Sequence, residues 1–334
     1  MSSGIKIGAV ETVGRVWIAP MTGVSDLPFR RAASRLGASY VATEMVACAE
    51  LARGRPDVVR RAAVGDGLPL MVVQLVGREP RWIAEGARLA AAAGADVIDL
   101  NMGCPAREVT GAACGSALMR DLELAERLIE AALSAGVPVT VKMRLGWDAS
   151  CQNAPELAQR AERLGVSALT VHGRTRCQFY SGAADWTAVG AVKQAVSIPV
   201  IVNGDTVDAA SAAQALALSG ADGVMVGRGA YGRPWIARAL EAALADAPAP
   251  TPDAGARLEI ALTHLHESLA FYGDRLGLRI FRKHLGWYVM DGPAPVDPAQ
   301  RREAKARLCR LEDARSVEAA LTELWSDVPV RWAA

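Results

Sequence analysis

Short apolar runs recur through the first 240 residues, and each is followed by a polar or glycine-containing turn and then by an amphipathic stretch. The amphipathic stretches, such as RWIAEGARLAAAAG (81–94), carry apolar residues at helical spacing. The apolar runs are rich in β-branched residues and almost free of polar positions, which is typical of strands that are covered on both faces of a parallel sheet. We therefore expect eight strands, at residues 16–21, 40–45, 70–75, 97–102, 137–144, 168–174, 198–205 and 222–229.

Eight alternations of strand and helix within about 230 residues predict a (β/α)8 (TIM) barrel, an α/β fold. A doubly wound parallel sheet is the alternative, but it usually has fewer strands and a glycine fingerprint after the first one. Here the first strand runs into APMTGVSD (19–26) instead. The opening IKIGAVETVGRV (5–16) predicts a hairpin that closes the bottom of the barrel.

The pattern changes at ALADAPAPTPDAGA (243–256), where prolines interrupt any helix or strand. Only helical patterns follow, and Asp297–Pro298 is a typical helix start, with a capping side chain and proline in the first turn. We expect a barrel domain over residues 1–242 and a small all-helical domain over 255–334.

Composition adds few constraints. A net charge of +1 over 334 residues gives no bulk indication of a nucleic-acid partner, so any basic surface must come from local clustering. The six cysteines contain no CxxC pair, which favours free thiols in a reducing compartment and gives no metal site. The N-terminus lacks an apolar signal core and no run approaches 18 apolar residues, so we expect a soluble, cytoplasmic protein.

Polar residues stand at the ends of nearly all the predicted strands, which is where TIM barrels build their active sites. These residues are Pro20–Met21, Glu44, Gln74, Asn101, Cys104, Lys142, Arg144, His172, Arg174, Asn203–Asp205 and Gly227–Arg228. A lysine inside an apolar strand needs a reason: Lys142 either forms an ion pair with Glu44 or Asp99, or faces an electron-rich cofactor ring beside Gln74. His172 is either a core histidine or a site residue, and its place at a strand end favours the site.

The last two strands end in NGD and GRG, where barrels of this kind often bind phosphate. Glycine exposes backbone N–H groups, and Arg228 adds a positive charge. The stretch GRGAYG (227–232) matches the dinucleotide pattern formally, but no βαβ unit and no acidic residue about 20 positions on accompany it. We interpret it as a phosphate-binding loop.

Two further features concern cysteine and histidine. DLNMGCPA (99–106) places Cys104 on a tight turn at a strand end, although a small buried cysteine is the plainer interpretation. The glycine-rich stretch 106–121 that follows is long for a barrel loop and predicts a mobile flap. His264 and His266 lie two residues apart on a helix, so they point to different faces, cannot share one metal ion and are expected to be structural.

With these residues in hand, the sequence resembles the tRNA-dihydrouridine synthase family, and most closely its bacterial B-type branch. The matching stretches are APMTGVSD (19–26), DLNMGCPA (99–106), GSALM (115–119), VKMRLGW (141–147), HGRT (172–175), VNGD (202–205), GRGAYGRPW (227–235) and RIFRKHLGWY (279–288). They cover nearly the whole barrel in the family's order and extend into the helical domain.

The resemblance implies an FMN-containing barrel that uses NADPH to reduce the C5–C6 double bond of particular D-loop uridines in tRNA. By motif, the FMN-binding positions are Ala19, Pro20, Met21, Gln74, Lys142, His172, Asn203, Gly204, Asp205, Gly227 and Arg228. Asn101 and Arg144 correspond to substrate-binding positions, and Cys104 to the catalytic cysteine. Reduced FMN would give a hydride to C6, and Cys104, protonated near neutral pH, would give a proton to C5. Lys142 would stabilise negative charge on the reduced flavin.

Basic residues cluster on two helices of the C-terminal domain. Arg279, Arg282 and Lys283 share one helix face, and Arg301, Arg302, Lys305, Arg307 and Arg310 follow on the next helix. We interpret the first cluster as tRNA-binding, with a solvated helix face as the alternative. A target uridine must leave its stack to reach a flavin, at a cost of a few kcal/mol.

Two other functions remain open from the residues. Another FMN barrel, such as a dihydroorotate or enoate reductase, explains the phosphate loop but neither the basic helices nor the Cys104 motif. A non-catalytic RNA-binding protein explains the helices, but not the intact set of Cys104, Lys142 and phosphate loop.

Overall fold

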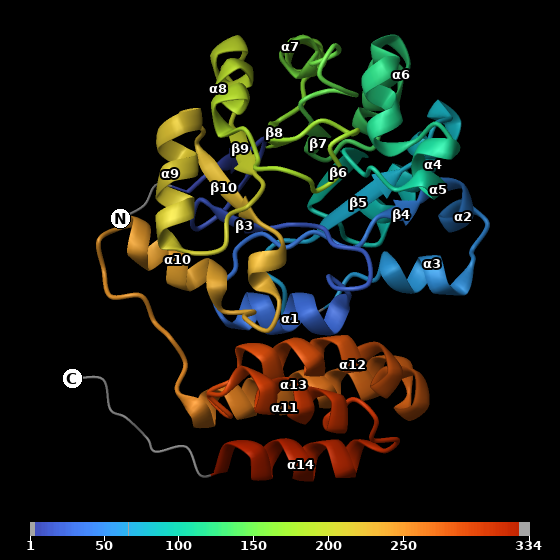
Figure 1. Cartoon of the computed structure of the whole chain (residues 1–334). Helices are drawn as coiled ribbons and strands as arrows, with labels where there is room; N and C mark the ends of the chain where they lie inside the picture. Colours follow the sequence, from blue (N-terminus) through green and yellow to red (C-terminus); the bar gives the residue numbers. More distant parts are fainter. Residues whose placement is uncertain (1–3, 66, 327–334) are drawn as a thin grey trace.

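Eight parallel β segments form a closed TIM barrel in the computed structural model, which describes residues 4–65 and 67–326 (Figure 1). The hydrogen-bonded order is β3-β10-β9-β8-β7-β6-β5-β4, and parallel bridges from Ile18 to Val41 and from Ala42 to Val72 close the circle. The strands are β3 (Val16–Ile18), β4 (Val46–Ala47), β5 (Val72–Val76), β6 (Val97–Met102), β7 (Val139–Arg144), β8 (Ala168–His172), β9 (Val200–Asn203) and β10 (Gly223–Val226). The predicted fold class is confirmed.

Helices surround the strands and connect each to the next. They are α1 (Leu27–Arg35), α2 (Cys48–Ala52), α3 (Pro56–Arg61), α4 (Pro80–Ala92), α5 (Arg107–Gly111), α6 (Leu122–Leu133), α7 (Ala154–Leu164), α8 (Trp186–Ala195), α9 (Ala209–Ser219) and α10 (Ile236–Leu244), with 3-10 helices η1 (Gly115–Arg120) and η2 (Arg228–Ala230). Asp26, Asp121, Asp185 and Asp208 cap four of them by accepting from a backbone N–H group.

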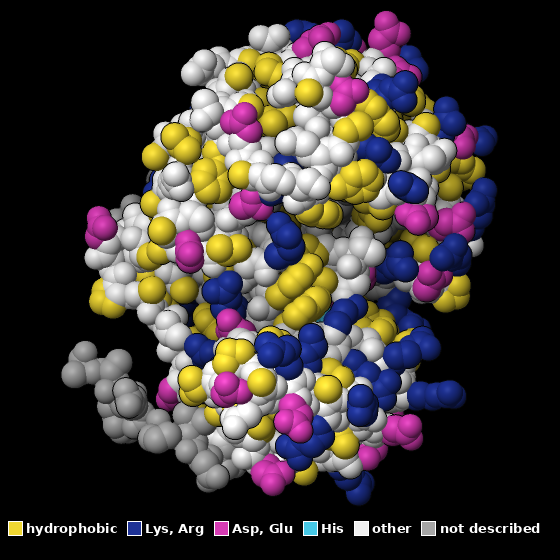
Figure 2. Space-filling view, in the orientation of Figure 1, with side chains coloured by type: hydrophobic (Ala, Val, Ile, Leu, Met, Phe, Trp, Pro, Cys, Tyr) yellow, Lys and Arg dark blue, Asp and Glu magenta, His cyan; other side chains and the backbone are white. Residues whose placement is uncertain are grey.

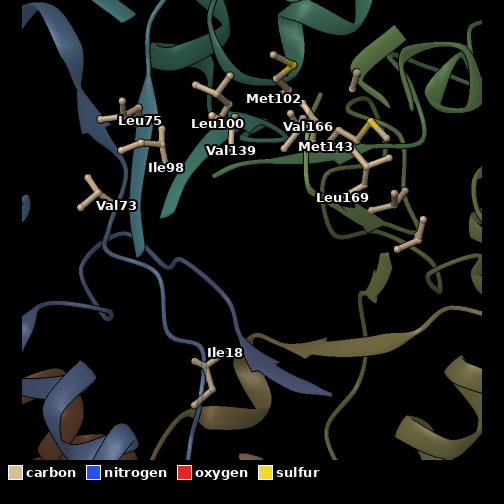
Figure 3. Packing of buried hydrophobic residues seen from close by; sticks show 14 of the residues in the cluster. Ile18, Val73, Leu75, Ile98, Leu100, Met102, Val139, Met143, Val166 and Leu169 are labelled. Atoms are coloured by element: carbon tan, nitrogen blue, oxygen red, sulfur yellow. The ribbon is translucent and has the colours of Figure 1, made fainter. Parts of the chain in front are cut away.

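The alternation of side chains along each strand separates two apolar layers. Outward positions, including Ile18, Val73 and Ile98, pack beneath the surrounding helices, and Figure 3 shows several of them. Inward positions near the strand starts, such as Trp17 and Val72, form a smaller core inside the barrel. The inward positions are apolar only in the lower half of the barrel, which leaves the upper half for polar chemistry.

The second strand is broken where a continuous one was expected at residues 40–45. Single bridges at Val41 and Ala42 are followed by β4 only at Val46–Ala47. The hydroxyl of Thr43 accepts the N–H of Gln74 and so replaces a backbone carbonyl in the ladder. This side-chain hydrogen bond interrupts regular pairing at that point.

A hairpin of β1 (Lys6–Ile7) and β2 (Val10–Glu11) lies at the bottom of the barrel, as the sequence predicts. Ile7 is fully buried and belongs to the inner core. In that core Trp17 stacks on Tyr40, with ring centroids 3.9 Å apart. The hairpin therefore closes the end opposite to the polar one.

Four helices follow the proline-rich stretch: α11 (Ala254–Tyr272), α12 (Asp274–Asp291), α13 (Pro298–Leu308) and α14 (Ala314–Ser326). They share a separate apolar core that includes Leu265, Phe281 and Leu321, and Figure 1 shows them beneath α1. Residues 1–3, 66 and 327–334 of the two expected domains lie outside the described residues. Within the described part of the chain, no helix is both long and apolar enough to cross a membrane.

Candidate active site

Polar side chains occupy the inward positions in the upper half of the barrel. The parallel register places Asn101 beside Lys142, and Arg144 beside His172, which in turn is paired with Asn203. Because these residues belong to neighbouring strands and all point inward, β6 to β9 contribute one continuous polar rim. The sequence predicts these strand ends as site positions. That prediction did not use the alternation along each strand, which turns the polar side chains inward and the apolar ones outward.

A cavity of about 770 Å³ opens at this rim, a volume suited to a small organic ligand. It is lined by all the predicted cofactor residues except Gln74, namely Ala19, Pro20, Met21, Lys142, His172, Asn203, Gly204, Asp205, Gly227 and Arg228. Tyr180, Thr206, Val207, Gly229, Tyr231 and Arg233 complete the lining. Gln74, Asn101, Cys104 and Arg144 lie outside this lining, on or just after the adjoining strands β5, β6 and β7.

A chain of hydrogen bonds runs from the interior of the barrel to Cys104. Buried Asp99 accepts from Thr140 at 2.7 Å and from Gln74 Nε2 at 2.6 Å. Gln74 Oε1 accepts from Asn101 Nδ2 at 2.7 Å. Asn101 Oδ1 then accepts the backbone N–H of Cys104 at 2.9 Å. Since a carboxylate only accepts, Asp99 fixes the orientation of both amides and thereby the turn that carries Cys104.

The Cys104 thiol is protonated at neutral pH. Burial raises its pKa, an effect that outweighs the nearby Lys142 and Arg144 charges. The backbone is held from the other side by Ser116, whose hydroxyl donates to the Cys104 carbonyl at 2.8 Å. Gly115 has a φ of +59°, and a Cβ there would lie 2.8 Å from that carbonyl oxygen, so glycine is required.

The segment 106–121, for which the sequence predicts a mobile flap, is partly helical. It forms two short helices, α5 and η1, and Leu118 and Met119 of η1 are buried. Asn153 also donates to the carbonyl of Met119 at 2.8 Å. The second half of the segment therefore has four buried residues, Gly115, Ser116, Leu118 and Met119, whereas α5 in the first half has none.

Lys142 is partnered by Asn203, whose Oδ1 accepts from Nζ at 3.0 Å, rather than by Glu44 or Asp99. Burial lowers the pKa of Lys142 to about 8, helped by the Arg144 charge and opposed by Asp99. The side chain is therefore mainly cationic at neutral pH, at the wall of the cavity. Asn203 is itself held by donating from Nδ2 to the Met225 carbonyl at 2.8 Å.

His172 is neutral. Burial, followed by the charges of Lys142, Arg144, Arg174 and Arg228, holds its pKa well below the ordinary value. Its Nε2 lies 3.2 Å from Arg174 Nη1, and because a guanidinium only donates, Nε2 accepts and the proton resides on Nδ1. His172 thus presents an uncharged ring to the cavity.

Asp205 organises the end of the cavity that is formed by the loops after β9 and β10. Its carboxylate accepts from Arg174 and, at 3.2 Å, from Arg228. A carboxylate repels an anion, so the Asp205 side chain positions the two arginines rather than binding phosphate itself. Beside it, Gly204 has a φ of +117°, and a Cβ on Gly227 would meet no atom within 4 Å. We call Gly204, Asp205, Gly227 and Arg228 the anion cradle.

Arg144 has backbone partners. Its Nε donates to the carbonyl of Gly103 at 2.9 Å, and Nη1 donates to those of Thr175 and Phe179. The side chain therefore ties the turn before Cys104 to the loop after β8. Tyr180, which the sequence analysis did not identify, projects from that loop with its ring 5.7 Å from the Arg144 guanidinium.

Arg174 and Tyr180 show the limits of prediction from motifs. Arg174 belongs to the HGRT motif and stands at one of the predicted strand ends. Its spacing, two residues after His172, is the sequence feature that indicates a site residue. Tyr180 lies in a loop with no periodic pattern, and nothing in the local sequence marks it.

The predicted tRNA-binding residues of α12 face two directions. Arg279 and Arg282 line a groove between α11, α12 and α14 that also contains Arg275, Arg315 and several acidic residues. Lys283 reaches the barrel instead, because its Nζ lies 3.0 Å from where a Cβ on Gly23 would be. Figure 2 shows Lys and Arg side chains on both sides of the junction between the barrel and the helices.

One aromatic pair joins the cavity to the helical region. Tyr231 lines the cavity and stacks on Trp287 of α12, with centroids 3.9 Å apart and rings 11° from parallel. In the second basic run, Arg301 turns inward and donates to the carbonyls of Pro295 and Met290.

A TIM barrel whose polar rim carries a buried cation, a nearby thiol and one open cavity has the architecture of a TIM-barrel enzyme. Residues 17–324 match the family model described as Dihydrouridine synthase (Dus), and the chain belongs to this family. The resemblance found in the sequence is confirmed.

Curated relatives match this chain over nearly their whole length. The chain is 49% identical over 327 residues to a "Probable tRNA-dihydrouridine synthase" of Rhodobacter capsulatus, covering 97% of this chain and 98% of that protein. It is 43% identical over 330 residues to "tRNA-dihydrouridine synthase B" of Pseudomonas putida, covering 97% and 95%.

Solved structures show the same fold at low identity. Histamine dehydrogenase from Rhizobium sp. 4-9 is 13% identical, with a TM-score of 0.56 over 79% of this chain and 50% of that one. The old yellow enzyme homologue from Zymomonas mobilis is 14% identical, with a TM-score of 0.50 over 76% and 95%. At these identities the similarity shows the fold alone.

Proposed function

We propose that this protein is an FMN-dependent tRNA-dihydrouridine synthase that uses NADPH to reduce D-loop uridines. The observation that carries the proposal is the convergence, on one rim of the barrel, of a protonated thiol, a buried lysine and an anion cradle. The names of the curated relatives support tRNA as the substrate. With this function we also propose a cytoplasmic location.

The cavity fits FMN. Its volume suits a tricyclic ring with a ribityl phosphate, and the open space at Gly227 lets backbone approach an anion. The buried hydroxyl of Thr206, which lines the cavity, has no hydrogen-bond partner in the part of the chain that the structure describes, so a bound ligand would satisfy it. Gly204, Gly227 and Arg228 would hold the phosphate, while Lys142, Asn203 and His172 would hold the ring.

When bound and reduced, FMN supplies the hydride for C6 of uracil. The protein supplies the rest. Cys104 holds a proton that can be delivered to C5, since its thiol is neutral at physiological pH. Lys142 would place a positive charge beside the ring. Tyr180, which lines the cavity, would stack on the base, and Arg144, which is bound to the Phe179 carbonyl and lies 5.7 Å from the Tyr180 ring, would hold that loop in position. We propose the division of labour expected from the sequence: residues 1–242 bind FMN and carry the chemistry, and residues 255–334 bind tRNA.

The decisive experiment has two parts. The purified protein should be yellow, and it should consume NADPH faster when unmodified tRNA is added, with dihydrouridine appearing in that tRNA. NADPH consumption driven by a small enoate or by dihydroorotate, without a tRNA effect, would favour the other FMN barrels. A colourless protein with full tRNA affinity would favour a binding protein.

Replacing Arg228 with alanine should weaken FMN binding about tenfold, because one charged hydrogen bond to the phosphate is lost. Affinity for riboflavin, which has no phosphate, should stay unchanged. Fluorescence quenching titrations measure both ligands. Arg88→Ala on the outer surface of α4 is the matched control, and equal loss of both ligands in Arg228→Ala would refute the phosphate assignment.

Replacing Arg279 or Lys283 with glutamine should weaken tRNA binding. The slope of log affinity against log salt concentration should become shallower by about 0.7–0.9 for each phosphate contact that is lost. Filter binding over a range of salt concentrations measures both quantities. Lys193→Gln on α8 removes the same charge from the barrel surface and should change neither. An unaltered salt slope in both test variants would return these residues to a merely solvated helix face.

A further inference from the structure

A buried polar cluster lies where the barrel meets the helical region, outside the cavity. Asp26 stands at the start of α1, His264 lies on α11 and His284 lies on α12. Their exposed fractions are 5%, 0% and 2%. One potential ligand atom from each residue lies within 4.8 Å of the other two. Among the residues that the structure describes, no other group of His, Cys, Asp and Glu has this arrangement.

Both histidines carry a nitrogen that lacks a hydrogen-bond partner among the described residues. These atoms, Nε2 of His264 and Nε2 of His284, are buried. The rings contact each other, with centroids 4.5 Å apart, and Phe29 stacks on His284. Leaving a buried polar nitrogen unpaired costs about 1–3 kcal/mol, so two such nitrogens in one cluster indicate a missing ligand.

Three other polar atoms of the cluster already have partners, namely Nδ1 of His264 and both carboxylate oxygens of Asp26. Nδ1 of His264 lies 3.0 Å from the hydroxyl of Tyr288. Asp26 accepts from the backbone N–H of Phe29 and from the hydroxyl of Tyr272, both at 3.1 Å. Ligating histidines and carboxylates in metal sites have outer hydrogen bonds of this kind, which fix their orientation.

We propose that Asp26, His264 and His284 bind one zinc ion. Two imidazoles and one carboxylate are ligands that Zn²⁺ accepts, and a water molecule or the second oxygen of Asp26 would complete four-coordination. Both rings are almost wholly buried, which favours the neutral imidazole, the form that ligates. A divalent cation also compensates the buried Asp26 carboxylate.

The position of the site defines its role. Asp26 belongs to the barrel, whereas both histidines belong to the helices, so a bound ion would fasten the two parts together. None of the three residues lines the cavity. The sequence predicts no metal site, because His264 and His266 point to different faces of their helix. In the structure His266 is exposed and lies beside Glu318. The partners of His264 are residues 238 positions before it and 20 after it, which no local motif reveals.

The test uses the full chain with its flavin bound, purified without a metal-affinity column. Elemental analysis should find one zinc ion per chain. Removing it with a chelator should lower the melting temperature by roughly 5 °C, and adding ZnCl₂ should restore it. His284→Gln and Asp26→Asn should each weaken Zn²⁺ affinity at least about tenfold while retaining flavin, since the asparagine still caps α1.

His266→Gln, on the same helix α11, is the matched control and should retain the ion. Cys104→Ala and Cys114→Ala should retain it too, because no thiol belongs to the site. A protein with no zinc and no thermal response to added ZnCl₂ would overturn the proposal. Unchanged zinc binding in His284→Gln and Asp26→Asn would also overturn it.

Discussion

Cys104→Ala is expected to lower the rate of uridine reduction in tRNA by about 10²–10⁴-fold, the usual contribution of a positioned acid. Burial raises the pKa of the thiol and keeps it protonated, and Asn101 and Ser116 fix the backbone that carries it. Alanine leaves that backbone intact but removes the proton. Single-turnover formation of dihydrouridine by the pre-reduced enzyme measures the step directly.

The matched control is Cys114→Ala, on the same segment and also half-buried. It should reduce tRNA at the normal rate. In Cys104→Ala, reduction of the flavin by NADPH without tRNA should be unaffected, because the thiol takes no part in it. Full activity of Cys104→Ala, or an equal loss in both variants, would rule out the assigned role.

Lys142→Met should slow reduction of the flavin by NADPH about 100-fold, because a buried cation that stabilises developing negative charge is lost. Affinity for tRNA should remain unchanged, since Lys142 lies inside the barrel. The pKa of Lys142 is lowered to about 8, so its cationic form declines as the pH rises through that value. The rate in the unaltered protein should fall with it, and the Lys142→Met variant should lack this dependence.

Stopped-flow absorbance of the flavin, recorded across that pH range, measures the effect. Lys193→Met is the control, because Lys193 pairs with Asp222 on the barrel surface. Parallel losses of flavin reduction and tRNA binding in Lys142→Met would mean that the residue supports the fold instead.

The barrel could be predicted from the sequence because the patterns that mark its strands and helices are local. Each β-branched run precedes a turn and an amphipathic helix, so β6 and β7 end at the expected residues. The break in the second strand could not be predicted from the sequence, because it depends on a hydrogen bond from the N–H of Gln74, on another strand, to the hydroxyl of Thr43. Hydrogen bonds across strands carry no periodic signature.

The candidate site follows the same division. Motifs supplied the residues that line the cavity, because turns at strand ends are short and distinctive. They did not reveal that the Asp205 carboxylate holds two arginines, or that Asp99 orients Cys104 through two amides. These roles depend on side-chain direction, which the alternation along strands supplies only once the register is known.

The stack of Tyr231 on Trp287 connects the lining of the barrel cavity to helix α12. Because Tyr231 lines the cavity and Trp287 belongs to α12, a shift of the helices relative to the barrel would either separate the two rings or move one wall of the cavity. Under the proposed function, tRNA held by the helices would therefore act on the shape of the cavity through this stack.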